Sequence, residues 1–494
     1  MVLWLGFGAA RCRCDQEALV RDAEVGVAIG PQLHVATSLY FGICQPRAKG
    51  CLHNHFQCYW GHDRLCGHWY CKPDPNCAQR EERGVKNWSG NVTFDANLVV
   101  RPTSVDDIKS AVLAADSVRA LGSAHSFNRI ADSKDVLISF EHFPKDIEID
   151  AVGKQVRVAA GVRYGELAIA LHGAGLALPN MGSLPHITVV GATSTGTHGS
   201  GLKNQNLSAA IRSIELITAN GDDITITEEE LASARVALGA LGIIHHMTLQ
   251  AIDTFAVAQT IFLDLPFENL IHHFEAIMGA GYSVSAFTTW GDLLIDQLWV
   301  KSRVDIDTLP GDELFSARRA TRKVHPLAGA ATKSATEQLG SIGPWHERLP
   351  HFKLNFTPSF GEELQSEYFV DVKDAAAALS AVHALRAKIQ PLLLVTELRT
   401  IAADDNWLSE AFGRESLAIH FTWKPDVAGV TAFLPTLEAA LAPFNVRPHW
   451  GKLFTDADFD FKALYPNFSE WLAYRAGLDP DRKFINEQLS SWRI

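Results

Sequence analysis

The sequence is nearly free of cysteine outside its beginning. All 8 cysteines fall between Cys12 and Cys77, and no cysteine follows in the rest of the 494 residues. A body without cysteine cannot depend on disulfides, so we expect a hydrophobic core and, by default, a cytoplasmic location. No apolar run approaches the roughly 18 residues that a membrane-spanning helix needs, and we expect no membrane partner.

Positive charge is also in short supply. The chain has 44 Lys and Arg against 56 Asp and Glu, which gives a net charge of −12. Phosphate backbones are bound by clustered cations, so a nucleic-acid partner is disfavoured. With 47% hydrophobic and 20% charged residues, the composition is that of a globular protein of about two to four domains. It favours an enzyme for a neutral or small substrate.

The head of the chain, residues 1–82, follows different compositional rules. Its cysteines are interleaved with His53, His55, His62 and His68, but no Cys-x-x-Cys pair occurs. A zinc module and a secreted disulfide domain therefore stay open as alternatives. The apolar stretch from Val2 to Ala10 lacks the flanks of a signal peptide. We expect a poorly ordered extension or an incorrect start, and no metal.

From about Gly84 onward the sequence alternates between strand and helix patterns. Ser104 is typical of a helix N-cap, because Asp106 and Asp107 follow in the first turn. Strands are predicted at 97–101, 119–122, 136–140, 155–159, 213–218 and 223–227, and helices at 104–115 and 164–173. Beyond residue 252, strands are predicted at 258–263, 285–290, 297–303, 352–358 and 365–370, a helix at 372–388 and an exposed insertion at about 305–343. The mixture is α+β, with a broad sheet in the second half.

Two segments rich in small residues can approach a ligand closely. Residues 121–128 read LGSAHSFN directly after a predicted strand, and residues 182–201 are dense in Gly, Ser and Thr. Free backbone N–H groups in such segments can hold a pyrophosphate. Neither segment is a Walker A loop or a Gly-x-Gly-x-x-Gly fingerprint, so a nucleoside triphosphatase and a Rossmann dehydrogenase are disfavoured. Two tight surface turns are the alternative.

Two apolar strands carry polar residues on one face. Alternation places Glu397 and Arg399 together within 392–401, and His420 and Thr422 together within 417–423. Neighbouring strands would present all four side chains to one cavity. The alternative is an ion pair within the sheet plus a core histidine. Close to the chain end, Lys452 follows two aromatic groups, which is a weak signal by itself.

At these residues the sequence resembles the alditol oxidase family, among the flavoprotein oxidases with the vanillyl-alcohol-oxidase type of FAD-binding fold. The resemblance covers residues 85–490, and residues 1–82 have no counterpart in the family. It is carried by NWSGN at 87–91, LGSAHSFN at 121–128, the run at 175–201, PWHERLPHF at 344–352, LQSEY at 364–368, 397–400, 420–423, 448–452 and KFIN at 483–486. We expect an FAD-binding domain at 83–252, a substrate-binding domain at 253–445 and a C-terminal segment at 446–494 that returns to the flavin.

The resemblance implies that FAD is bound covalently through His125. It implies further cofactor contacts from Ala120, Leu121, Gly122, Ser123, Ala124, Ser126, Ser183, Thr188, Gly191, Thr195, Gly196, Thr197, His198, Ile244 and His449. It implies substrate hydroxyls held by Ser183, Gln297, Glu397, Arg399, Thr422 and Lys452, with His420 in the same row.

The reaction that the resemblance implies is oxidation of the terminal hydroxyl of an alditol such as xylitol or sorbitol to the aldose. Hydride leaves for the flavin, and O₂ is reduced to hydrogen peroxide. Lys452 and His420 are candidate bases, while Arg399, oriented by Glu397, would stabilise alkoxide character. Gly182 would leave room for O₂, and we expect a monomer. A sugar-1,4-lactone oxidase or dehydrogenase is the alternative, and a binding role centred on the head is a third.

Overall fold

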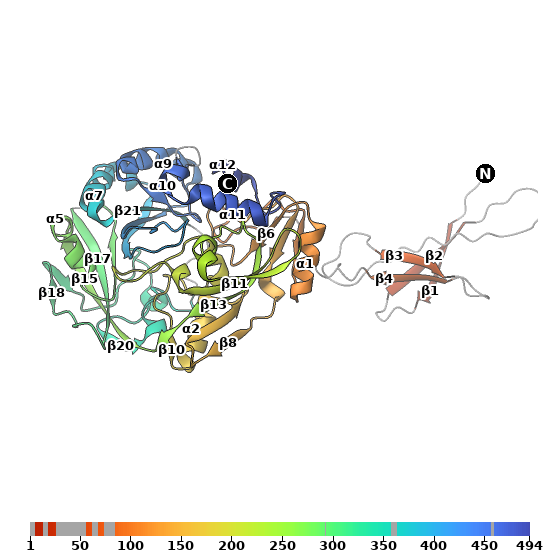
Figure 1. Cartoon of the computed structure of the whole chain (residues 1–494), viewed down its shortest axis with the longest axis horizontal. Coiled ribbons are helices and arrows are strands. Elements are labelled where there is room, and N and C mark those ends of the chain that lie inside the picture. The colour runs from red at the N-terminus through yellow and green to blue at the C-terminus, as the bar shows by residue number, and fades with distance from the viewer. Residues whose placement is uncertain are drawn as a thin grey trace, which may run out of the picture. The chain divides into compact units, whose positions relative to one another are not determined.

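A computed structural model of the whole chain describes residues 84–291, 293–356, 363–455 and 459–494, together with the backbone of four strands nearer the N-terminus (Figure 1). Its contacts divide the chain into two units, residues 1–81 and 82–494. In the first unit, β1 (Leu5–Cys12) pairs antiparallel with β2 (Ala18–Val25), and β3 (Phe56–Gly61) with β4 (His68–Pro73). The zinc, disulfide and disorder hypotheses concern side chains and segments outside the described part, and they stay predictions.

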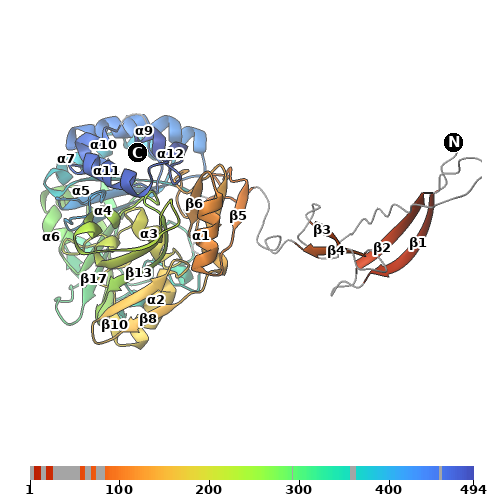
Figure 2. The same ribbon diagram turned by 45° about the vertical axis from the view of Figure 1, so that its right-hand side comes forward.

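The second unit opens with a small parallel sheet. Its order is β5 (Leu98–Val100), β7 (Val136–Ser139), β6 (Val118–Leu121). The connecting helix α1 (Val105–Ala114) begins as the sequence predicts: the hydroxyl of Ser104 accepts from the backbone N–H of Asp107, whose carboxylate accepts from the N–H of Ser104 at 3.1 Å. Figure 2 shows α1 beside β5 and β6. Strand β6 ends where the LGSAHSFN segment starts.

An antiparallel sheet of 5 strands follows, in the order β12-β11-β13-β9-β8. Its members are β8 (Ile147–Asp150), β9 (Gln155–Ala159), β11 (Ile211–Ile217), β12 (Asp223–Thr227) and β13 (Ile243–Gln250). The strands predicted at 213–218 and 223–227 are confirmed, and β11 and β12 pair as a hairpin across a turn in which Gly221 has φ +80°. Beside this sheet come α2 (Tyr164–Gly173), α3 (Val189–Ser194), α4 (Leu231–Ala234) and the short pair β10 (Leu176–Ala177) and β14 (Ile252–Asp253).

A broad antiparallel sheet forms the rest of the body, as expected. It has 10 strands, in the order β18-β19-β15-β17-β16-β22-β23-β21-β24, with β20 paired to β15. The strands are β15 (Ala256–Pro266), β16 (Ser283–Thr288), β17 (Leu294–Arg303), β18 (Glu313–Leu314), β19 (Ala317–Arg319), β20 (Ser341–Pro344), β21 (Leu364–Asp371), β22 (Leu393–Ile401), β23 (Ser416–Trp423) and β24 (Arg447–Pro448).

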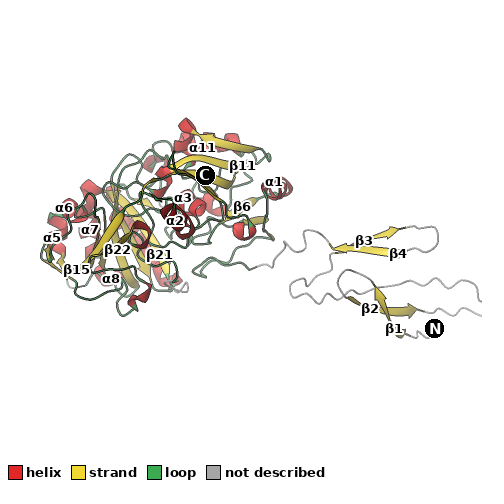
Figure 3. Ribbon diagram, turned by 90° about the horizontal axis from the view of Figure 1, so that it is seen from below, coloured by secondary structure: helices red, strands yellow, loops and turns green. Residues whose placement is uncertain are grey.

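Helices cover one face of this broad sheet (Figures 1 and 3). They are α5 (Phe267–His272), α6 (Phe274–Met278), α7 (Ala375–Ala384), α8 (Arg386–Ile389) and α9 (Val427–Leu441). Ile419, Phe421 and Trp423 of β23 lie in the core between the sheet and these helices. Because side chains alternate along a strand, the residues between them point to the opposite face, which is polar.

One stretch corrects the expectation about long apolar runs. Val427–Phe444, which is α9 and the turn after it, has the length and a mean hydropathy of 1.4 that a membrane-spanning helix would show. Val430, Leu434 and Leu437 of this stretch are buried in the core beneath the helices. Packing on the sheet accounts for its apolar character.

The C-terminal segment packs back on the first half of the body. It contains α10 (Phe461–Leu464), α11 (Phe468–Leu478) and α12 (Glu487–Ser491). Trp471 and Trp492 belong to the same core as β9, β11 and β13. Buried Arg119 of β6 donates to the carbonyls of Gly239 (2.8 Å), Leu238 (2.7 Å), Phe484 (2.7 Å) and Ile130. The domain limits at 252 and 445 stay predictions, because the contacts treat 82–494 as one unit.

Three element predictions need correction. Residues 352–356 are the described part of the predicted strand 352–358; of these, only Phe352 forms a bridge, to Ala335, and a turn follows. The chain turns there because the carbonyl of Leu354 contacts the His186 ring at 2.6 Å, while its side chain lies against Gly165, where a Cβ would not fit. The insertion at 305–343 is not only a loop, since it supplies β18, β19 and β20 to the sheet edge. The helix predicted at 372–388 breaks into a turn, α7 and α8.

Candidate active site

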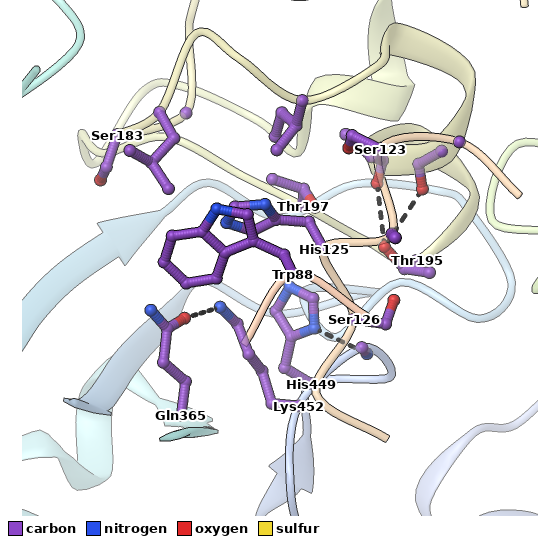
Figure 4. Close-up of a pocket in the computed structure, with 18 of the residues that line it drawn as sticks. Trp88, Ser123, His125, Ser126, Ser183, Thr195, Thr197, Gln365, His449 and Lys452 are labelled. Carbon is purple, nitrogen blue, oxygen red and sulfur yellow. Dashed lines mark hydrogen bonds between the residues drawn. The ribbon is translucent and has the colours of Figure 1, made fainter. Parts of the chain in front are cut away.

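One cavity is bordered by both small-residue segments and by the polar face of the broad sheet. On the first side, the segment after β6 meets α3. A Cβ on Gly122 would lie 2.4 Å from the Thr188 hydroxyl, and one on Gly191 would lie 2.7 Å from it. The two glycines therefore allow the two backbones to approach, and they leave an open cradle lined by Ser123, Thr195 and their neighbours (Figure 4).

His125 occupies the wall of this cradle. Its ring lies 4.3 Å from that of Trp88, centroid to centroid, and Phe127 contacts it edge-on at 6.4 Å. Its Nε2 is buried and has no hydrogen-bond partner among the described residues. Burial, together with nearby Lys452, lowers the pKa of His125 to about 3. The imidazole is therefore neutral at physiological pH, with a lone pair available.

The C-terminal segment closes the cavity over this loop. The N–H of Phe127 donates to the carbonyl of Gly451 at 2.8 Å. The side-chain amide of Asn128 donates to the carbonyls of Trp450 and Lys452, both at 2.8 Å. These bonds hold the 450–452 turn across the cradle, so Lys452 faces His125 and Trp88 (Figure 4).

The polar face of the sheet carries the second half of the site. Glu397 of β22 pairs directly with His420 of β23, as their register shows. Arg399 contacts Glu397 Oε1 through Nε at 3.5 Å and donates to the hydroxyl of Ser183 through Nη1 at 3.3 Å. The predicted convergence of Glu397, Arg399, His420 and Thr422 on one cavity is confirmed.

Gln365 of β21 connects the candidate bases. Its amide nitrogen donates to Glu363 at 2.6 Å, which leaves the carbonyl oxygen free to accept. That oxygen accepts from Lys452 Nζ and from His420 Nε2, the latter at 3.0 Å. His420 therefore carries its proton on Nε2, and its Nδ1 is left with the lone pair.

A buried carboxylate links the cradle to the sheet. Glu367 Oε1 accepts from Arg399 Nη2 at 2.8 Å and from His198 Nε2 at 3.0 Å. Its Oε2 is buried without a hydrogen-bond partner among the described residues. Burial would raise the pKa of Glu367, but His198 and Arg399 outweigh it and hold the pKa well below its usual range.

The two candidate bases differ in charge. Burial, against the pull of Glu367, lowers the pKa of Lys452 to about 8. Burial lowers the pKa of His420 to about 3, so that ring is neutral across physiological pH. Burial would raise the pKa of Glu397, but Arg399 and His351 reverse the effect and keep it below its usual range. The site thus combines a fixed cation, a fixed anion and a lysine that titrates.

Most residues of the predicted site border the cavity. On its wall lie Ala120, Leu121, Gly122, Ser123, Ala124, His125, Ser126, Ser183, Gly191, Thr195, Thr197, His198, Ile244, Glu397, Arg399, His420, Thr422, His449 and Lys452. Three do not. Thr188 is turned toward the two glycines, Gly196 lies against buried Glu410, and Gln297 bonds the carbonyl of His325 at 2.8 Å and Trp299 Nε1 at 2.9 Å.

Among the wall residues that were not predicted from the sequence are Gln365, Glu367 and His351. Gln297, which was predicted to hold a substrate hydroxyl, does not border the cavity, whereas Gln365 does. Gln365 and Glu367 share one face of β21 within the LQSEY stretch, so strand alternation could have indicated both. His351 follows no periodic pattern, since the segment around it is not a strand.

One group of side chains outside the cavity has metal-ligand chemistry. Glu215, His245 and His246 place ligand atoms within 4.8 Å of one another. Arg157 already holds the Glu215 carboxylate, with its Nε and Nη2 at 2.6 and 2.7 Å, and the Nδ1 atoms of the two histidines contact each other at 2.8 Å. A cation would have to displace the guanidinium, so we assign no metal there.

Comparisons with known proteins agree on the class of protein. Residues 96–227 match the FAD binding domain family, and residues 353–492 match the D-arabinono-1,4-lactone oxidase family. An alditol oxidase from a Streptomyces species is 44% identical over 81% of this chain and 97% of its own length. An L-gulono-1,4-lactone dehydrogenase from Mycobacterium tuberculosis is 30% identical over 81% of this chain and 97% of its own.

Solved structures support the fold. A solvent-stable cholesterol oxidase superposes with a TM-score of 0.68 over 86% of this chain and 100% of its own, at 16% identity. A cholesterol oxidase from B. sterolicum gives the same TM-score over 84% of this chain and 97% of its own. The vanillyl-alcohol-oxidase type of fold is thereby confirmed. With a 44% identical relative matched over nearly its whole length, the chain belongs to the alditol oxidase family of FAD-dependent oxidoreductases.

Proposed function

We propose that the protein oxidises the terminal hydroxyl of an alditol, such as xylitol or sorbitol, to the aldose, while O₂ is reduced to hydrogen peroxide. The observation that carries the proposal is the row of polar groups opposite His125. Ser183, Gln365, Glu397, Arg399, Thr422 and Lys452 all border one cavity. Each hydroxyl of a polyol donates one hydrogen bond and accepts others, so this mixture of donors and acceptors suits a chain of them.

The residues of the cradle fit FAD. Ordinary side chains at Gly122 and Gly191 would fill the space where the two segments meet. The buried Nε2 of His125, a residue of the cavity wall, has no hydrogen-bond partner among the described residues. A buried polar atom normally has a partner, so this one is consistent with a bound group. FAD, when bound, supplies the acceptor for the hydride and passes electrons on to O₂.

We further propose that His125 holds FAD covalently. A histidine that forms such a bond needs an unprotonated ring nitrogen, and the lowered pKa of His125 provides one at neutral pH. The His125 side chain borders the cavity, and its Nε2 has no protein partner among the described residues. The Trp88 ring, tilted by 30° against the imidazole, restricts the orientation of that ring.

Different side chains around the substrate would bind its hydroxyls and remove the hydroxyl proton. Arg399, held between Glu397 and Glu367, keeps a fixed positive charge where alkoxide character develops. Lys452 in its neutral form would take the hydroxyl proton. Glu397 would accept a hydrogen bond from a neighbouring hydroxyl and orient the carbon chain.

The test is the visible spectrum of the purified protein without oxygen. Addition of xylitol or sorbitol should bleach the flavin band near ~450 nm, and admission of air should restore it with formation of peroxide. A yellow protein that both polyols leave unbleached would contradict the proposal.

A lactone substrate is the second candidate, because residues 353–492 match the D-arabinono-1,4-lactone oxidase family. The same experiment with L-gulono-1,4-lactone in place of the polyol separates the two. Bleaching by the lactone alone would favour this candidate.

The covalent bond has its own test. His125→Ala should release its flavin on acid precipitation, whereas the wild-type precipitate should stay yellow. His449→Asn is the matched control, since it removes another imidazole from the cavity wall. Flavin that stays attached in His125→Ala would refute this attachment site.

A further inference from the structure

A buried lysine stands behind the substrate wall and takes no part in the proposed chemistry. Lys301 of β17 is only 1% exposed. Its Nζ donates to the carbonyl of Leu349 and to Nδ1 of His351, the latter at 3.0 Å. Burial lowers the pKa of Lys301 to about 7, and a buried amino group is costly unless it is hydrogen-bonded, so its retention here needs a reason.

The contact with Lys301 fixes the proton of His351. Nζ of Lys301 donates to Nδ1 of His351, and the Glu397 carboxylate beside Nε2 can only accept, so the ring proton resides on Nε2. Nε2 lies 2.7 Å from Glu397 Oε1 and donates to it. The hydroxyl of Ser285, 3.4 Å from the same Nε2, is more distant. Phe287 and Trp299 pack edge-on against the ring at 5.4 and 5.2 Å and hold its plane.

In this arrangement one carboxylate oxygen of Glu397 is contacted by protein groups, and the other is available to a ligand. His351 Nε2 and Arg399 Nε both contact Oε1. Among the described residues, no hydrogen bond reaches Oε2, which is left for a substrate hydroxyl. If the ring proton moved to Nδ1, the Nε2 lone pair would face the carboxylate, and Glu397 would lose its orientation.

We propose that Lys301 is a positioning residue that sets the tautomer of His351 and thereby orients Glu397 for the substrate. The inference rests on the proposed role of Glu397 in holding a hydroxyl. Glu397 would bind that hydroxyl equally before and during hydride removal, so loss of its orientation should raise KM and leave kcat nearly unchanged.

The first test is Lys301→Met, which keeps the length and removes the donor. We expect KM to rise at least about tenfold, because a misoriented Glu397 would lose its hydrogen bond to the substrate hydroxyl, while kcat and flavin content stay near wild type. Gln259→Met is the matched control, because Gln259 pairs with Lys301 across β15 and β17, is equally buried and bonds Thr336 and the carbonyl of Glu337 rather than the His351 ring. Equal kinetic changes in both variants, or a fall in kcat alone, would overturn the proposal.

The second test acts on His351 and stands even if Lys301→Met fails to fold. His351→Gln can still donate to Glu397 from its amide and should keep KM near wild type, whereas His351→Phe should raise it about tenfold. In the His351→Gln background, Lys301→Met should add nothing further. A full additive effect there would refute the proposed chain of contacts from Lys301 through His351 to Glu397. Each variant is measured with whichever substrate bleaches the wild-type flavin, so failure of the polyol proposal is seen separately.

Discussion

The identity of the base can be decided by pH, because the two candidates titrate far apart. Lys452 has its pKa lowered from 10.5 to about 8 by burial. It can act as a base only in its neutral form, which exists above that pKa. His420, with a pKa lowered to about 3, is neutral over the whole working range. If Lys452 is the base, activity should rise with pH, and if His420 is the base, it should not.

The expected size of the rise in activity follows from the fraction of molecules in which Lys452 is neutral. At pH 6 about 1 in 100 molecules would carry neutral Lys452, and at pH 8 about half would. The rate constant kcat/KM should therefore rise about 50-fold between these values and level off above pH 9. Glu397 adds no step in this range, since Arg399 and His351 keep its pKa below the usual value.

The assay is the rate of flavin bleaching at low polyol concentration without oxygen, from pH 6 to pH 10. Lys452→Met should lose about 10²- to 10⁴-fold in rate and show no rise with pH. His420→Gln should keep the rise, because it leaves Lys452 in place. A flat wild-type profile, or a rise that persists in Lys452→Met, would refute the assignment of Lys452.

Three further variants test the cradle and its support. Gly196→Ala would place a Cβ 2.2 Å from the Glu410 carboxylate at φ +73°, so the ratio of flavin to protein absorbance should fall, and a full complement of flavin would contradict the geometry. Arg119→Met leaves buried carbonyls such as that of Phe484 without a donor, and urea unfolding should show a loss of at least about 3 kcal/mol, since each orphaned acceptor costs about 1 to 3. In Gly182→Ala the added Cβ would have its nearest neighbour at 3.7 Å, so the variant should fold normally. Reoxidation of its flavin by O₂ should be slower than in the wild type, while anaerobic bleaching stays unchanged. Equal reoxidation rates would show that Gly182 does not lie on the path of oxygen.

Local patterns predicted much of the sheet that carries the site. Because side chains alternate along a strand, Glu397 and Arg399 of β22 could be assigned to the face opposite the apolar one. In the structure Glu397 pairs with His420, as expected for neighbouring strands. The N-cap of helix α1 and the limits of α2 and β9 could be predicted equally well, because helix caps and hydrophobic periodicity depend on a few neighbouring residues. At these positions the secondary structure is determined by residues that are close in the sequence.

The misplaced residues depend on long-range pairing. Gln297 and Gln365 both lie on strands, and only the order of the sheet decides which one faces the cavity. Strand β21 pairs with β23 rather than with its chain neighbour, so Gln365 comes to lie opposite Thr422. His351 was hidden for the same reason: its position is set by Lys301 and Glu397, which are distant in sequence. No window of local sequence contains that information.

The turn at 450–452, which bonds Phe127 and Asn128, also sets the timing of assembly. A ribosome delivers this chain from residue 1 onward, so the cradle around His125 emerges long before the segment that covers it. Until the final segment leaves the exit tunnel, the nascent protein holds an uncovered cradle without Lys452. A site that contains Lys452 can therefore form only near the end of translation, and a message truncated before codon 450 encodes a protein without the turn that covers the cradle.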